Sequence, residues 1–208
     1  MGFLNAGCSF TRFRIVDPVP AELWGQIPQK LKQFAFRDID EIPEERSFGW
    51  TCFEDMLDTE WLTAPPEKGA YLAFSLRLDT RRVPAGVLKK HLSLALRSER
   101  ERIREQGKTF ISRERKKELK EQVHLRLMSR FLPVPAEFNV IWATDNNTVW
   151  FASTQGKMVD MFTEYFTQTF DLHLEQMTPF GLALSLLDES EASRLDVLEP
   201  TSFAAEGL

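Results

Sequence analysis

Residues 71–106 have the sequence YLAFSLRLDTRRVPAGVLKKHLSLALRSERERIREQ, and their pattern changes at Pro84. Before that residue, Tyr71–Leu78 is rich in apolar and β-favouring residues, which predicts a strand. Pro84 suits the first turn of a helix, and no helix breaker follows it before Gly107. The stretch therefore predicts a strand that leads directly into a long helix.

A second helix is expected after a short connection. Gly107 suits the C-terminal cap of the first helix, and Ser112 suits the N-terminal cap of the second. We expect Phe110 and Ile111 to pack in the corner between them. The apolar stripe of the second helix consists of Leu119, Val123, Leu127 and Phe131. These signals predict a long charged helical hairpin made of residues 84–106 and 112–131.

The chain before this hairpin predicts both strand and helix. Phe10–Val16 has the alternation of a strand, and the helix that follows has Pro28 in its interior. Because proline lacks a backbone donor, we expect Pro28 to kink that helix or to divide it. We interpret residues 37–46 as irregular chain and Phe48-Gly49-Trp50 as a packed turn.

The chain after the hairpin predicts a β-hairpin, a helix and a last strand, at residues 138–152, 157–170 and 172–177. The expected fold class is α+β, with mixed or antiparallel sheets packed with helices. We divide the chain into an N-terminal α+β region (1–80), a basic helical hairpin (81–132), a ββαβ region that packs with the N-terminal part (133–187) and an acidic, loose tail (188–208).

Charge is distributed unevenly along the chain. The 208 residues carry a net charge of −5. Residues 81–130 contain 16 Lys and Arg against 6 Asp and Glu, a net +10, whereas the remaining residues contain 10 against 25, a net −15. A basic zone on an acidic body indicates an anionic partner, and it favours DNA bound through its phosphates without sequence preference.

The candidate DNA-binding residues are the cations of the predicted hairpin. They are Lys89, Lys90, Arg97, Arg100, Arg104, Lys108, Arg113, Arg115, Lys116, Lys117, Lys120, Arg126 and Arg130. Neutralising phosphates releases counterions, so binding through such a surface weakens as the salt concentration rises. We expect duplex DNA as the preferred partner, with single-stranded DNA as the alternative.

Other roles of the charged hairpin stay open. Pairs such as Arg97/Glu101 and Glu114/Lys117 have the spacing of ion pairs on an exposed helix face that is simply solvated. The hairpin could instead dock an acidic protein partner. A coiled-coil contact is a third option, although the apolar stripe is short for sustained heptads.

No motif for catalysis or metal binding is found in the sequence. The three histidines are scattered, and the acidic residues between Asp38 and Asp58 lack the spacing of a magnesium nuclease. We therefore expect a protein that is not an enzyme and that needs no cofactor and no metal ion. A magnesium-dependent exonuclease is the less favoured alternative.

Cysteine usage and hydropathy point to the cytoplasm. Cys8 and Cys52 are far apart and do not form a C-x-x-C motif, which fits a reducing compartment. The sequence has neither a signal-peptide pattern nor an apolar run long enough to span a bilayer. We expect a cytoplasmic protein with no membrane partner.

Several segments between about Ser9 and Leu187 form a recognisable order. The most specific of them is the basic segment SRERKKELKEQV at residues 112–123. The others are Phe34-Ala35-Phe36, Ser47-Phe48-Gly49-Trp50, Val83–Lys90, Met128–Pro133, Trp142 and Val149-Trp150. In these segments and their order the chain resembles the RdgC family of bacterial recombination-associated proteins.

This resemblance implies a nucleoid-associated protein that binds DNA with little sequence preference and restrains RecA-dependent recombination by occupying DNA. It also implies a homodimer, which in the family is a ring with a basic hole through which duplex DNA can pass. The chain ends where the last third of longer family members begins, so it resembles a shortened member in which ring closure stays open. The exonuclease label that the family has carried is not supported by any metal-site pattern. The matched cations are Arg113, Arg115, Lys116, Lys117 and Lys120, together with Lys89 and Lys90.

Overall fold

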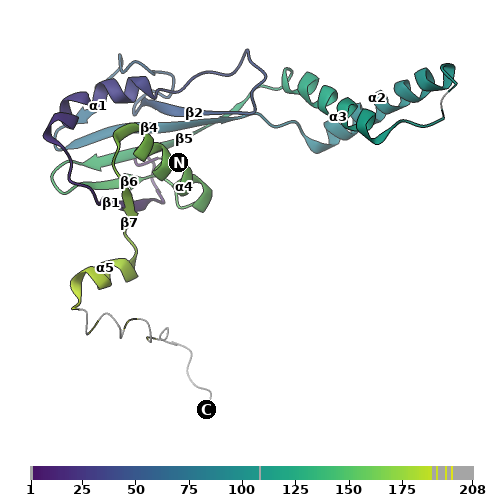
Figure 1. The fold of residues 1–208 in the computed structure, drawn as a ribbon. Coiled ribbons are helices and arrows are strands. Elements are labelled where there is room, and N and C mark those ends of the chain that lie inside the picture. The colour runs from purple at the N-terminus through teal and green to yellow at the C-terminus, as the bar shows by residue number, and fades with distance from the viewer. Residues whose placement is uncertain (1, 108, 189–190, 192–194, 196–197, 199–208) are drawn as a thin grey trace.

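The computed structural model describes residues 2–107, 109–188, 191, 195 and 198, and its strands form one antiparallel sheet (Figure 1). Over these residues the chain has seven strands and five helices. The α+β fold class expected from the sequence is therefore confirmed. The candidate cation Lys108 and most of the expected acidic tail, 188–208, lie outside the described residues.

The sheet has the strand order β2-β4-β5-β6-β1-β7, and β3 pairs with the beginning of β4. The strands are β1 (Thr11–Ile15), β2 (Arg46–Cys52), β3 (Glu67–Lys68), β4 (Tyr71–Thr80), β5 (Val134–Ala143), β6 (Thr148–Phe151) and β7 (Leu174–Gln176). The helices are α1 (Ala21–Gln33), α2 (Ala85–Glu105), α3 (Arg113–Met128), α4 (Gly156–Phe170) and α5 (Pro179–Leu186). Strands that precede α2 in the chain and strands that follow α3 thus lie in a single sheet.

The hydrophobic core lies between one face of the sheet and the helices α1 and α4. Along β4, Leu72, Phe74, Leu76 and Leu78 alternate with residues of the other face, so all four reach this core. The two helices complete it with side chains at helical spacing, which are Leu23, Ile27 and Leu31 of α1 and Met158, Phe162, Tyr165, Phe166 and Phe170 of α4. A cross-strand shift of one residue would move the β4 set out of the core.

Helix α1 continues through Pro28 and is not divided there. The missing N–H of proline removes one intrahelical hydrogen bond. Leu23 and Ile27 before the proline and Leu31 after it are all buried in the same core. Packing on both sides of Pro28 therefore keeps the two halves in one helix, so of the two expected alternatives, a kink or a division, the division is wrong.

Phe48-Gly49-Trp50, expected as a turn, lies in the middle of β2. A second segment crosses this strand closely: the N–H of Phe36 donates to the carbonyl of Trp50 at 2.9 Å, and the N–H of Trp50 donates to the carbonyl of Phe34 at 3.0 Å. A Cβ at Gly49 would overlap the backbone of Phe36 and lie 2.7 Å from the carbonyl carbon of Ala35. Glycine marks a close backbone approach here, which is why the turn interpretation failed.

Gly49→Ala should lower the free energy of unfolding by about 2–3 kcal/mol, because backbone atoms of the crossing segment cannot move aside cheaply. Gly86→Ala is the matched control, since no atom lies within 4 Å of its added Cβ. That control should leave stability unchanged or raise it by up to about 1 kcal/mol within α2. Urea unfolding followed by circular dichroism measures both, and equal stabilities for the two variants would contradict the close approach.

Candidate nucleic-acid interface

Helices α2 and α3 extend away from the sheet as a pair (Figure 1). The ladder between β4 and β5 runs from Tyr71↔Ala143 to Thr80↔Val134, so the chain leaves and re-enters the sheet at paired positions. With 21 residues, α2 is about 31 Å long. The paired strand ends therefore direct a helical arm of that length into solvent.

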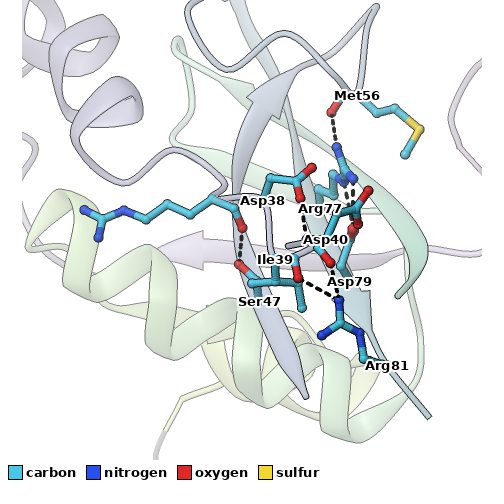
Figure 2. Close-up of polar contacts among 9 residues, drawn as sticks. Asp38, Ile39, Asp40, Ser47, Met56, Arg77, Asp79 and Arg81 are labelled. Carbon is cyan, nitrogen blue, oxygen red and sulfur yellow. Dashed lines mark hydrogen bonds and ion pairs between the residues drawn. The ribbon is translucent and has the colours of Figure 1, made fainter. Parts of the chain in front are cut away.

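Arg81 holds the body segment at the base of this arm (Figure 2). Its buried guanidinium donates to the carbonyl oxygens of Ile39 at 2.7 Å and Asp40 at 3.0 Å. The backbone N–H of Arg81 donates to the carbonyl of Glu45 at 2.8 Å. The carboxylate of Glu45 in turn lies 3.7 Å from Nε2 of His124 on α3. Residues 39–45 thus contact both Arg81, which lies just before α2, and His124, which lies in the C-terminal half of α3.

The acidic residues beside this base are engaged in structural contacts (Figure 2). Asp79 accepts two hydrogen bonds of 2.8 Å from Arg77, and this pairing raises the pKa of the guanidinium. Asp38 accepts the backbone N–H of Asp40 at 2.6 Å. Within the described residues, no three His, Cys, Asp or Glu side chains are grouped so that they could hold a metal ion.

The two helices of the arm are joined by the buried carboxylate of Glu99. It accepts hydrogen bonds from Arg115 of α3 at 2.8 Å and from Arg102 at 2.7 Å, and Arg115 also pairs with Glu118 at 2.8 Å. The hydrogen bond from Arg115 is the main cause that lowers the pKa of Glu99. Arg115, expected as a phosphate contact, is therefore engaged inside the arm.

Seven of the candidate cations form what we term the basic flank. Successive residues turn by about 100° around a helix, so positions three or four apart lie in one column. The flank consists of Lys89, Arg97, Arg100 and Arg104 in one column of α2, and Arg113, Lys116 and Lys120 in one column of α3. All seven are exposed, and among the described residues none is paired with a carboxylate.

The acidic residues of the arm lie mainly on the opposite flank. By the same spacing, Glu105 of α2 and Glu114, Glu118 and Glu121 of α3 fall away from the cation columns, whereas Glu101, four residues after Arg97 and three before Arg104, borders the column of α2. The remaining candidates are placed less favourably: Lys90 and Lys117 lie at the outer edges of the columns, Arg126 follows the column of Glu118, and Arg130 lies beyond the end of α3.

A hollow of about 400 Å³, termed the tip hollow, lies where the two cation columns meet at the far end of the arm. Arg100 and Arg104 line it from α2, and Lys116 lines it from α3. Because these three line one hollow, the two columns face the same side of the arm. Its other lining residues are Ile103, Thr109, Phe110 and Ile111, so none of the described residues brings a carboxylate to it.

The expectation that Phe110 packs in the corner between the helices is wrong. Ile111 is buried there, but the side chain of Phe110 is 78% exposed at the rim of the tip hollow. The connection turns through Gly107, which has a φ of 71°, and Ser112 caps α3 by accepting the N–H of Arg115 at 3.1 Å. The short turn leaves room for only one of the two apolar side chains between the helices.

Comparison with known proteins assigns a family to this arrangement. The family model described as "Putative exonuclease, RdgC" matches residues 9–182, which is most of the chain. The chain belongs to the RdgC family. The match confirms the family expected from the sequence, and it includes the whole basic flank. No curated protein sequence matches this RdgC-family chain.

The RdgC family is associated with recombination, and its description carries an exonuclease label. Among the helices that the structure describes, none has both the length and the apolar character needed to cross a membrane. The DNA contacts of the individual cations stay predictions. The tip hollow and its aromatic rim were missed, because they depend on which side of each helix faces the other.

Hydrogen exchange of the arm should depend on pH through Glu99. Its pKa is lowered from the usual 4.5, so the ion pairs stabilise the folded arm fully above pH 4.5 and are lost as the pH falls through the lowered pKa. Protection factors of amides in 113–128 should therefore fall below pH 4.5. In Glu99→Gln they should already be low at neutral pH, whereas Glu101→Gln, an exposed glutamate of the same helix, should behave as the unmodified protein does.

Proposed function

We propose that this RdgC-family protein binds DNA without sequence preference through the basic flank. The observation that carries the proposal is the pair of adjacent cation columns on one side of the arm, with no carboxylate partners among the described residues. Phosphates repeat along DNA whatever its sequence, so cations repeated along two helices suit them. The length of α2, about 31 Å, matches about one turn of duplex.

By occupying DNA in this way, the protein restrains RecA-dependent recombination and associates with the nucleoid in the cytoplasm. Its membership in a recombination-associated family supports this part of the proposal. The proposal includes a homodimer. Exposed apolar side chains of α5 support it, namely Phe180 at 50% and Leu186 at 85%, because such surface is favourably covered by a second subunit.

Duplex binding should weaken with salt with a slope of about −5 in log K against log salt, if about six phosphates are contacted. Arg113→Glu with Lys120→Glu removes two of these contacts and should make the slope shallower by about 2. Fluorescence anisotropy of a labelled duplex measures both slopes, on two duplexes of unrelated sequence that should bind equally.

Arg12→Glu with Lys157→Glu is the matched control, because it changes the net charge equally at exposed sites outside the arm. This control should keep the original slope and nearly the original affinity. Affinity that does not change from low to high salt would exclude phosphate binding. Absence of DNA binding at low salt, together with capture of an acidic protein that the arm reversals abolish, would favour the protein-docking alternative.

The proposal assigns binding without cleavage, so end-labelled duplex and single-stranded DNA should stay intact with the protein in magnesium or manganese. Asp79 and Asp38, two carboxylates beside the base of the arm, are already engaged in hydrogen bonds. Shortened fragments on a denaturing gel, absent when EDTA is added, would support the exonuclease description instead.

A further inference from the structure

The tip hollow combines two kinds of ligand-binding chemistry. Arg100, Arg104 and Lys116 bring three cations to a space of about 400 Å³ that is lined by no carboxylate of the described part of the chain. Beside them, the side chain of Phe110 is 78% exposed, and Thr109 also lines the hollow. A ligand that satisfies all these groups has an anionic part and a flat apolar part close together.

A nucleotide unit has this combination, because a phosphate is joined through a sugar to an aromatic base. Arginine and lysine bind the phosphate, and an aromatic side chain stacks on the face of the base. Inside a duplex, away from its two ends, both faces of each base are covered by neighbouring base pairs. The ring of Phe110 can therefore stack on the bases of single-stranded DNA but not on those inside a duplex.

We propose that the tip hollow binds one backbone phosphate of single-stranded DNA while Phe110 stacks on the adjoining base. This inference rests on the proposed function, since the same arm carries both. The rest of the basic flank contacts phosphates of either DNA form. The hollow adds affinity for the single-stranded form alone, at the end of the arm that lies farthest from the acidic body.

The test compares Phe110→Leu with the unmodified full-length protein on a single-stranded oligonucleotide and on a duplex, both containing 2-aminopurine. Phe110→Leu keeps an apolar side chain but removes the ring face. It should bind the single strand about 5- to 150-fold more weakly, the loss expected for one stacked base, and bind the duplex unchanged. The quenching of 2-aminopurine by stacking should be lost as well, and Phe110→Trp should restore both.

Leu125→Ala is the matched control, because Leu125 is an exposed apolar residue of α3, at 58%, outside the tip hollow. It should leave both affinities unchanged. If Phe110→Leu weakens duplex and single strand equally, or changes neither, the stacking site is overturned while DNA binding by the basic flank stands. If Phe110→Leu instead converts a dimer into a monomer, so that the molar mass of the protein in solution falls by half, Phe110 contacts a second copy and the inference is wrong. If neither DNA form binds at low salt, the proposed function itself fails.

Discussion

The pairing of β4 with β5 is the constraint on which the rest of the structure depends. It joins ten residues on each side, from Tyr71↔Ala143 to Thr80↔Val134, across the whole intervening arm. Closing so long a segment costs chain entropy, and the ladder and the core beneath it must offset that cost. In return, the ladder fixes where the arm begins and ends, and its register also sets which β4 side chains enter the core. The core and the direction of the arm therefore have a common origin.

The arm has little apolar core of its own, so its two helices depend on a few specific contacts. Glu99 is one of them, because it brings Arg102 and Arg115 together from two helices. A buried carboxylate is stable only when it is paired, and here the pairing uses cations that a charge count would assign to the surface. Part of the positive charge of the arm is thus structural. Among the described cations without a carboxylate partner, seven form the basic flank, and their arrangement in columns makes them a surface that an anion can follow.

Much of the fold was predictable because strand and helix periodicity is local. The expected strands near residues 10–16, 71–78 and 138–152 and the helix at 157–170 were confirmed. The errors arose where a segment distant in the sequence determines the local structure. Gly49 was taken for a turn residue, but it admits the crossing chain at Ala35 and Phe36. For the candidate site, the cations could be named from the sequence, but the side of the arm on which each cation lies could not. Arg115 and Phe110 exchange the roles expected of them, since the charged side chain is used in packing and the apolar one is left exposed.

The position of the arm also bears on how an acidic protein can attract DNA. Opposite and like charges interact over about 8 Å at physiological salt before screening removes most of the effect. Residues 39–45 contact the base of the arm and are rich in carboxylates. Lys89 and Lys90 lie near the start of α2, which is the end of the helix closest to these carboxylates. Arg100 and Arg104 lie at least about 23 Å from Ala85, the first residue of α2, measured along the helix axis. That distance is longer than the screening length. The favourable potential for a phosphate should therefore increase from the base to the tip. If DNA binds as proposed, a long arm separates it from the acidic body, which a compact domain with the same net charge could not do.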